Sequence, residues 1–180
     1  MPPRAGRKSG MTSGEAQRQN ESAQSAEDGL LIGKARFADV PLIKAIVDPY
    51  AARDRMLPRS AVELFENIRE YFVCRDGGRV VACAALHIFS PEIAEIRALA
   101  VHPDYMSRGI GSRLIEECVA EARAFGIPKV FTLTLEEGFF GRSGFRTVQR
   151  DTLTLKVWQE CYRCPKFDRC DEIAMVKSVD

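Results

Sequence analysis

The sequence has no long hydrophobic run and almost no net charge, and each absence excludes a broad class of protein. In 180 residues, 26 lysines and arginines offset 25 aspartates and glutamates, so the formal charge is +1. Domains that bind nucleic acid usually carry a marked basic excess, so we expect no nucleic-acid partner. No segment approaches the roughly 20 apolar residues of a membrane-spanning helix, so we expect no membrane partner.

The first 28 residues also lack the apolar stretch of a secretory signal. They are polar and rich in Ser, Gln, Glu and Arg, a composition typical of a disordered tail. The remaining residues, 29–180, suffice for a single domain with a proper core. Cys74, Cys83 and Cys118 fall at apolar positions, as small core residues do in a reducing compartment, and a cytoplasmic location is expected.

Residue patterns along 29–180 predict a succession of strands and helices. Asp76, Gly77 and Gly78 predict a hairpin, and Ser60 with Glu63 predicts a capping box at the start of a helix. The expected strands are 30–36, 71–75, 79–89, 94–101, 130–135 and 172–177, and the expected helices begin after Asp39, after Ser60 and near Ser112, with a short helical turn at 139–143.

Spacing on each helix predicts which side chains face the core. Asp39 is expected to cap the first helix, with Pro41 in its first turn, and Gly126 with Pro128 is expected to stop the third. The predicted core-facing residues are Leu42, Ile43, Ile46 and Val47 in the first helix, Val62, Phe65 and Ile68 in the second, and Leu114, Ile115, Cys118, Val119, Ala122 and Phe125 in the third.

The most informative stretch is 96–111, IRALAVHPDYMSRGIG, where an apolar strand enters a glycine-containing loop that opens an amphipathic helix. Gly109 and Gly111 let the backbone turn tightly and approach a ligand. The amides of the first helical turn point outward with the positive end of the helix dipole behind them, so an anion is expected there. The loop has neither the Gly-Lys-Ser/Thr ending of a P-loop nor the glycine spacing of a dinucleotide fingerprint.

This loop resembles motif A of the GNAT N-acetyltransferases, in which Arg/Gln-x-x-Gly-x-Gly/Ala follows a strand and holds the pyrophosphate of acetyl-coenzyme A. Methionine replaces the first Arg or Gln, and Arg108 is a substitute charge. The predicted element order also matches, so the resemblance implies an α/β (α+β) GNAT fold with a mixed, mostly antiparallel central sheet flanked by helices. The implied cofactor-binding residues are Leu99, Ala100 and Val101, through their backbone amides, and Met106, Ser107, Arg108, Gly109, Ile110, Gly111 and Ser112.

Acetyl transfer to an amine needs a base, because the amine is largely protonated at neutral pH. Period-two alternation places Glu95, Arg97 and Leu99 on one face of the strand 94–101. Many GNAT enzymes have a glutamate base where Glu95 falls, so the resemblance implies that Glu95 is catalytic. An ordinary surface glutamate is the alternative.

Two other positions bear on catalysis. Phe140 stands where the family usually has a tyrosine that acts as an acid, so no hydroxyl is expected there. A thiolate can depart without a strong acid, and the loss of the tyrosine does not argue against catalysis. His102 follows the strand directly, and we expect it to stabilise the loop rather than to catalyse.

Three separated segments narrow the resemblance: LPRS at 57–60, GFFGRSGF at 138–145 and the ending 156–177. They resemble short bacterial N-acetyltransferases of the N-acetylglutamate synthase type, which acetylate the α-amine of glutamate or a near relative in arginine biosynthesis. A small amino-acid acceptor, L-glutamate or L-glutamine, is thereby implied. Its carboxylates need cationic partners, for which Arg59, Arg97 and Arg53 are the candidates.

Three other functions stay open, one of which is a cysteine-loop interaction protein in which the fold is only a scaffold. A protein N-acetyltransferase would present an open acceptor groove instead of a small charged pocket. A catalytically silent acetyl-CoA-binding module would bind its ligand without turnover. Met106 and Phe140 favour the silent module, and Glu95 counts against it.

The segment 158–172 contains Cys161, Cys164 and Cys170 in the spacing C-x₂-C-x₅-C. Two intervening residues are usual between metal ligands, but a zinc site wants four ligands and no histidine lies nearby. Zinc, a metal-free loop and a Cys161–Cys164 redox pair are the alternatives, and we expect no metal. This segment and the last strand are placed where they would cover a neighbour in a homodimer.

Overall fold

The computed structural model describes residues 29–153, 161–164 and 166–179. The tail predicted for 1–28 and part of the cysteine segment lie outside these residues. Within the described ranges, no helix has both the length and the apolar character needed to cross a membrane.

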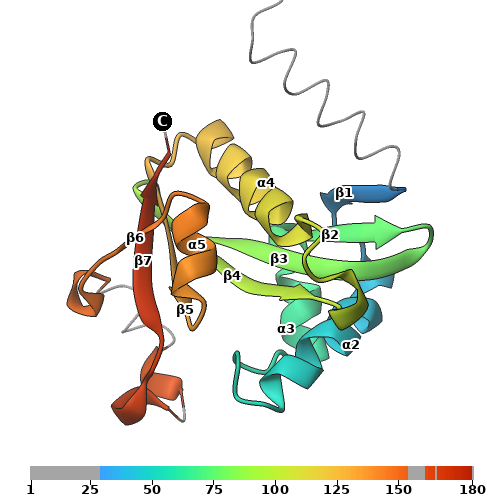
Figure 1. Cartoon of the computed structure of the whole chain (residues 1–180), viewed down its shortest axis with the longest axis horizontal. Coiled ribbons are helices and arrows are strands. Elements are labelled where there is room, and N and C mark those ends of the chain that lie inside the picture. Colours follow the sequence, from blue (N-terminus) through green and yellow to red (C-terminus); the bar gives the residue numbers. More distant parts are fainter. Residues whose placement is uncertain (1–28, 154–160, 165, 180) are drawn as a thin grey trace, which may run out of the picture.

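A single seven-stranded sheet organises the described residues, in the order β1-β2-β3-β4-β5-β7-β6 (Figure 1). Neighbouring strands are antiparallel except β4 and β5, which are parallel. The predicted mixed, mostly antiparallel sheet of the α/β class is confirmed. The strands are β1 (Leu30–Lys34), β2 (Tyr71–Asp76), β3 (Arg79–Ser90), β4 (Ile93–Val101), β5 (Lys129–Thr134), β6 (Arg146–Thr147) and β7 (Ile173–Ser178), of which only the two-residue β6 was not predicted.

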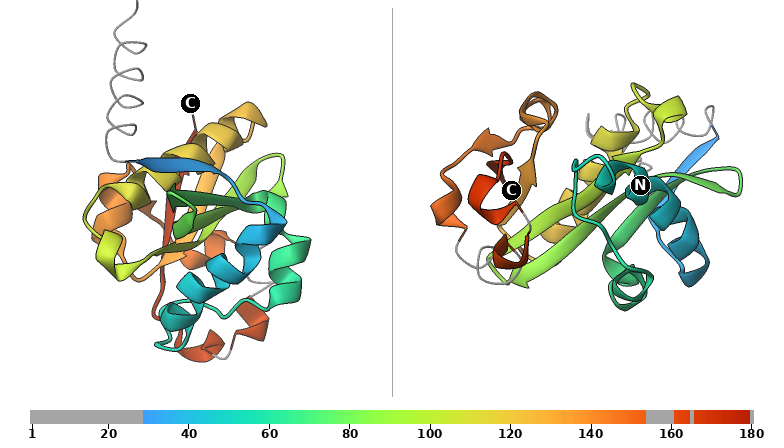
Figure 2. Two further views of the ribbon diagram at one scale, coloured as in Figure 1. Left: turned by 90° about the vertical axis from the view of Figure 1, so that its right-hand side faces the viewer. Right: turned by 90° about the horizontal axis from the view of Figure 1, so that it is seen from below.

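Helices cover both faces of the sheet. Helices α2 (Val40–Ala51) and α3 (Ala61–Glu66) lie on one face and α4 (Ile110–Ala124) on the other, while α5 (Glu137–Arg142) lies beside β5 and β7 (Figures 1 and 2). Short 3-10 turns join these elements: η1 (Phe37–Asp39), η2 (Ile68–Glu70), η3 (Pro103–Tyr105), η4 (Arg150–Thr152), η5 (Cys161–Arg163) and η6 (Phe167–Arg169).

The helix caps agree with the sequence in one place and differ in another. At α3, the Glu63 amide donates to Ser60 Oγ at 3.1 Å and the Ser60 amide donates to Glu63 Oε2 at 2.7 Å, so the predicted capping box is confirmed. Asp39 is the N-cap residue of α2, as predicted, but its side chain makes no cap hydrogen bond. Its carboxylate accepts from the Arg36 amide and from the Arg75 guanidinium instead, which turns it away from the first turn of α2.

The core has one large cluster on each face of the sheet, because residues of the central strands alternate between the two faces. On the α4 side, Phe72, Ala84 and Leu86 pack against the helix. On the side of α2 and α3, Tyr71 and Val73 pack against those helices. Even-numbered and odd-numbered residues of β2 therefore stabilise different layers.

Four residues predicted to face the core are exposed: Leu42 by 38%, Val62 by 64%, Phe65 by 46% and Phe125 by 64%. Helix α3 has only six residues and presents Leu64 to the core, with Ile68 following in η2, so Val62 and Phe65 point outward. Phe125 follows the last residue of α4, where the chain leaves the apolar stripe.

A β-bulge in β4 changes which side chains share a face. Arg97 pairs with Ala85 and Ala100 with Cys83, so two residues of β4, Ala98 and Leu99, oppose one residue of β3. Ala98 has a φ of 52°, in the left-handed region that is unusual for alanine. Leu99 therefore packs on the α4 face, and the prediction that it shares a face with Glu95 and Arg97 is wrong.

Strands β4 and β5 separate soon after they meet. Their pairing is limited to Ala94 with Val130 and Glu95 with Phe131, whereas β4 continues to Val101. The sheet thus opens into a wedge between an N-terminal part and the part formed by β5, β7, β6 and α5 (Figure 2). Glu95 lies where the wedge begins.

Candidate active site

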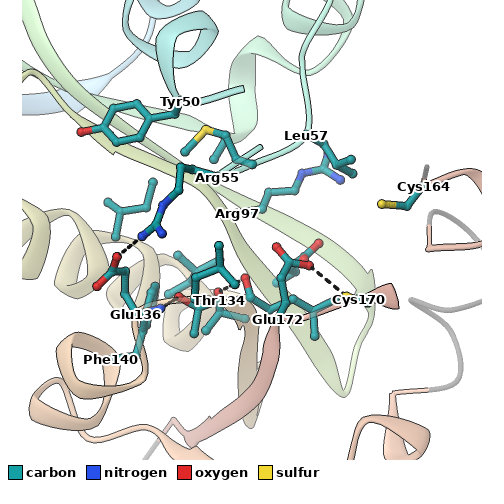
Figure 3. A pocket seen from close by; sticks show the side chains of 18 of the residues that line it. Tyr50, Arg55, Leu57, Arg97, Thr134, Glu136, Phe140, Cys164, Cys170 and Glu172 are labelled. Atoms are coloured by element: carbon teal, nitrogen blue, oxygen red, sulfur yellow. Dashed lines mark hydrogen bonds and ion pairs between the residues drawn. The ribbon is translucent and has the colours of Figure 1, made fainter. Parts of the chain in front are cut away.

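A cavity of about 180 Å³ lies in this wedge. One wall is the bulged segment of β4, a second is the end of β5 with α5, and a third is the loop between α2 and α3 (Figure 3). The remaining side is lined by residues near the C-terminus: Arg150, Cys161, Cys164, Cys170 and Glu172. The residues that line it with polar or reactive groups are Tyr50, Arg55, Arg59, Glu95, Arg97, Thr132, Thr134, Glu136, Arg150, Cys161, Cys164, Cys170 and Glu172.

Glu95 is the buried carboxylate of this cavity, with 3% of its surface exposed. It projects from β4 at the last residue that pairs with β5. A carboxylate on the wall of a cavity can accept a proton from a ligand that enters the cavity. The position is therefore suited to a general base.

Arg97 lies two residues further on the same face and also lines the cavity. Its Nη2 donates to Glu70 Oε2 at 2.9 Å, and its side chain is 8% exposed. The other Glu70 oxygen contacts His87 Nδ1 at 2.8 Å. His87 is the cross-strand partner of Glu95, so Glu70 links two residues beside the candidate base. The sequence analysis missed Glu70 and His87, because their proximity depends on the register of β3 against β4.

Arg59 and Arg97 converge on the same region from the α2–α3 loop and from β4. Burial raises the pKa of Tyr71 to about 12, and the positive charges of both arginines act against that rise. Both arginines line the cavity. Two cations on the wall of a small cavity are suited to binding carboxylates.

The other arginines of the α2–α3 loop are placed differently. Arg53 is exposed and does not line the cavity. Arg55 lines it and forms an ion pair with Glu136, which connects the loop to the turn between β5 and α5 (Figure 3). The sequence analysis did not single out Arg55, because nothing in the spacing distinguishes it from Arg53.

The loop before α4 has the geometry of an anion cradle. Ser107 and Gly109 have φ values of 62° and 73°, and the residues from Met106 to Gly109 are exposed. The first intrahelical bond runs from the Arg113 amide to the Gly109 carbonyl, so the preceding amides of α4 have no helical partner. The Arg108 guanidinium lies 4.8 Å from the centre of the Tyr105 ring. These residues fit a pyrophosphate.

Phe139 lies between the cradle and the cavity. A Cβ atom on Gly111 would lie 2.9 Å from Cζ of Phe139, which also lines the cavity. Glycine at 111 thus lets α5 pack directly on the first turn of α4. The cradle and the cavity are therefore neighbours that share the Phe139 side chain.

The end of β4 is held by Tyr50. Its hydroxyl donates to the Val101 carbonyl at 2.6 Å, and burial raises its pKa. Ala100 is buried, and Leu99 lines the cavity. All three residues predicted to bind the cofactor through their amides lie beyond the part of β4 that pairs with β5.

Phe140 and His102 are engaged in packing and loop contacts. Phe140 is 4% exposed and packs edge-on against Phe139 and Phe145. His102 accepts from the Asp104 amide at Nδ1 and contacts the Arg79 guanidinium at Nε2, at 3.3 and 2.9 Å. His102 is outside the cavity lining, in agreement with a role in stabilising the loop.

The cysteines fall into two groups. Cys74, Cys83 and Cys118 are fully buried in the core, as predicted, and burial raises the pKa of Cys83 to about 12. The other three line the cavity, and all six are free thiols. Among the described residues, no cluster of cysteine, histidine or acidic side chains is arranged to hold a metal ion.

A second hollow, of about 450 Å³, lies between β3 and the end of α4 and is lined by Lys34, Leu86, Ile88, Glu121 and Phe125 among others. Lys34 and Glu121 form an ion pair there at 2.6 Å. It is larger, but its two carboxylates are engaged in ion pairs, Glu121 with Lys34 and Glu70 with Arg97 and His87. The wedge is therefore the candidate active site.

Comparisons with known proteins agree with this assignment. Residues 40–145 match the model of the Acetyltransferase (GNAT) family. An uncharacterized N-acetyltransferase of Chlorobaculum tepidum is 40% identical over 148 residues, which are 82% of this chain and 96% of that protein. An amino-acid acetyltransferase of Mycobacterium tuberculosis is 36% identical over 136 residues, which are 74% and 78% of the two chains.

Among solved structures, this chain is similar to N-acetylglutamate synthase from Neisseria gonorrhoeae complexed with coenzyme A and N-acetyl-glutamate. The TM-score is 0.76 at 29% sequence identity. The match covers 84% of this chain but 35% of the synthase, so this chain spans about a third of that protein's length.

Proposed function

Because this chain belongs to the acetyltransferase (GNAT) family, we propose that it acetylates the α-amine of L-glutamate or L-glutamine. It is an acetyl-CoA-dependent N-acetyltransferase, and its relatives support an amino-acid acceptor. The observation that carries the finer proposal is that the buried Glu95 shares a small cavity with Arg59 and Arg97. A base beside two cations suits an acceptor with an amine and at least one carboxylate.

The roles of the residues follow from their positions. Acetyl-CoA supplies the acetyl group as a thioester. The first-turn amides of α4 bind its phosphates, and the open edge of β4 binds the pantetheine arm as an added strand would. Glu95 takes a proton from the acceptor ammonium, directly or through water, so that the amine can attack. Arg97 and Arg59 orient the acceptor carboxylates, and Glu70 holds the guanidinium of Arg97 in place.

The size of the cavity favours a small acceptor over a protein segment. At about 180 Å³ it is smaller than the pockets that usually hold drug-sized ligands. A protein N-acetyltransferase would need an open groove for several residues on either side of the target amine. The relatives named for amino-acid acetylation and the synthase complexed with N-acetyl-glutamate also support the amino-acid acceptor.

The proposal also includes the pathway and the cellular location of the reaction. An N-acetylated glutamate would enter arginine biosynthesis, as the resemblance to N-acetylglutamate synthases implies. The six free thiols are consistent with a cytoplasmic enzyme. We also predict a homodimer in which the cysteine segment and the last strand of one chain cover the neighbouring chain.

The test measures coenzyme A release from acetyl-CoA with each amino acid in turn and identifies every product by mass. We expect turnover with glutamate or glutamine and an acetyl group on the α-nitrogen. Glutarate, which has both carboxylates but no amine, and γ-aminobutyrate, which has no α-carboxylate, are the matched negative acceptors. Turnover on peptides but on no free amino acid would contradict the proposal and favour a protein acceptor. Tight binding of acetyl-CoA without any turnover would favour the silent module.

A further inference from the structure

The loop before α4 rests on the hairpin between β2 and β3. At the end of β2, the Asp76 carboxylate accepts a hydrogen bond from the Tyr105 hydroxyl, with 2.6 Å between the two oxygens. At the start of β3, the Arg79 guanidinium contacts Nε2 of His102 at 2.9 Å. Two side chains of the hairpin therefore fix the segment of chain that leads into the anion cradle.

The Tyr105 side chain is held at both ends. Its hydroxyl donates to Asp76, its ring meets the His102 ring edge-on with 6.1 Å between the centroids, and it packs against the core cluster on the α4 side. The hydrogen bond to the Asp76 carboxylate raises the pKa of Tyr105. The hydroxyl therefore stays protonated at neutral pH and continues to donate, so the ring is kept in one place.

Arg108 lies over this ring. Its Cζ atom is 4.8 Å from the ring centre, within the distance of about 6 Å at which an aromatic ring attracts a cation. Its two neighbours, Ser107 and Gly109, have φ values of 62° and 73°, so the chain turns back over Tyr105. Unlike a carboxylate, a ring does not neutralise the charge of an arginine. The exposed Arg108 can therefore still donate its N–H groups to an anion.

A second cation over a ring is arranged differently. Lys34 Nζ lies 3.9 Å from the centre of the Phe72 ring, but it also pairs with Glu121 at 2.6 Å. The charge of Lys34 is thus used within the fold. Arg108 directly precedes Gly109, the N-cap residue of α4, so its side chain starts at the rim of the cradle. Of these two cations, Arg108 is the one placed to contact a ligand.

We propose that Tyr105 and Asp76 are positioning residues for acetyl-CoA, which hold the Arg108 guanidinium where it binds the pyrophosphate. The guanidinium adds a charge-assisted contact to the backbone amides of α4, which remain the main part of the cradle. A side chain that is already held loses less rotamer entropy when the ligand binds. Arg108 thereby supplies the charge that Met106 lacks. The inference rests on the proposed placement of the phosphates and not on the identity of the acceptor.

The test compares the Kd values of three ligands that share the pantetheine arm. Dephospho-coenzyme A lacks only the 3′-phosphate of coenzyme A, whereas pantetheine lacks every phosphate. Arg108→Gln should weaken coenzyme A and dephospho-coenzyme A alike by roughly 3–10-fold and leave pantetheine unchanged. Tyr105→Leu should weaken the same two ligands by roughly 2–5-fold, the size of an exposed cation–π contact. Tyr105→Phe keeps the ring and should have a smaller effect of the same kind, and no change would exclude Asp76.

A double variant separates positioning from general support of the loop. Tyr105→Leu should cost nothing further in Arg108→Gln protein, because Tyr105 acts through Arg108. Additive losses, or equal weakening of pantetheine and coenzyme A, would overturn the proposal. A loss for coenzyme A that dephospho-coenzyme A does not share would place Arg108 on the 3′-phosphate and also overturn it.

Two controls complete the experiment. Arg69→Gln removes the same charge from an exposed site in η2 and should change no Kd. A natural chain that binds coenzyme A no more tightly than pantetheine would refute the proposed cofactor placement itself. Tight binding of coenzyme A that Arg108→Gln does not change would refute the positioning role alone.

Discussion

We call residues 102–112, which we propose bind the cofactor, the cofactor loop. Residues 50–59, 150–153, 161–164 and 166–172, which we propose bind the acceptor, are the acceptor wall. The two regions form their surfaces in different ways. The cofactor loop uses backbone amides that Gly109 and the start of α4 expose, so its function depends on local chain geometry. The acceptor wall uses side chains from segments about a hundred residues apart. Replacing a side chain should therefore damage the acceptor wall, whereas the cofactor loop should respond mainly to changes in backbone conformation.

The largest expected effect is at Glu95, the proposed base, which belongs to neither region. Glu95→Gln keeps the size of the side chain but removes the proton acceptor, so kcat should fall by about 10²–10⁴-fold. The Kd for coenzyme A should change little. Steady-state kinetics with isothermal titration of coenzyme A checks both values. Glu92→Gln, an exposed residue before β4, is the control. Full activity of the Glu95 variant at neutral pH would remove it from the mechanism.

A substitution of Arg59 should show that the acceptor wall depends on its side chains. Arg59→Ala removes one cation that lines the cavity, and a lost charge-assisted contact should raise the acceptor KM by roughly 10–100-fold. The KM for acetyl-CoA should be unchanged. Arg53→Ala, six residues earlier on an exposed site outside the lining, is the matched control. If both variants raise the acceptor KM equally, net charge and not a defined contact recognises the acceptor.

A substitution of Gly109 should show that the cofactor loop depends on backbone conformation. Its φ of 73° costs a residue with a side chain roughly 1–2 kcal/mol, so Gly109→Ala should weaken coenzyme A binding by about 5–30-fold. Gly126, with a φ of 71°, ends the same helix far from the cradle. Gly126→Ala should lower stability by a similar amount without changing the Kd for coenzyme A. Met106→Ala, in contrast, should bind coenzyme A nearly as well as the natural chain.

The sequence predicted the cofactor loop better than the acceptor wall. The six longer strands, the hairpin, the capping box and the loop before α4 depend on patterns within a few residues, and all were predicted. The β-bulge at Ala98 was not, because an alanine at positive φ leaves no trace in the residue pattern. It moved Leu99 to the opposite face from Arg97.

The acceptor side shows the limit most clearly. Arg59 was identified through its segment, but Arg55 and Arg150 were not. Their place in the cavity depends on how the wedge between β4 and β5 brings the α2–α3 loop to the C-terminal segment. Glu70 and His87 meet Arg97 and Glu95 only through strand register. Convergence of distant segments is a property of the fold that local spacing does not encode.

The smallest expected effect is at Tyr50, whose hydroxyl joins the acceptor wall to the backbone of β4. Tyr50→Phe removes the 2.6 Å hydrogen bond to the Val101 carbonyl and should lower the free energy of unfolding by about 0.5–1.5 kcal/mol. Both KM values should rise together by less than about tenfold, because the end of β4 borders both substrates. Urea unfolding and steady-state kinetics measure the two effects. Tyr50→Leu also removes the ring and should destabilise further. A rise in the acceptor KM alone would show that Tyr50 contacts the acceptor and that the two regions are not joined through β4.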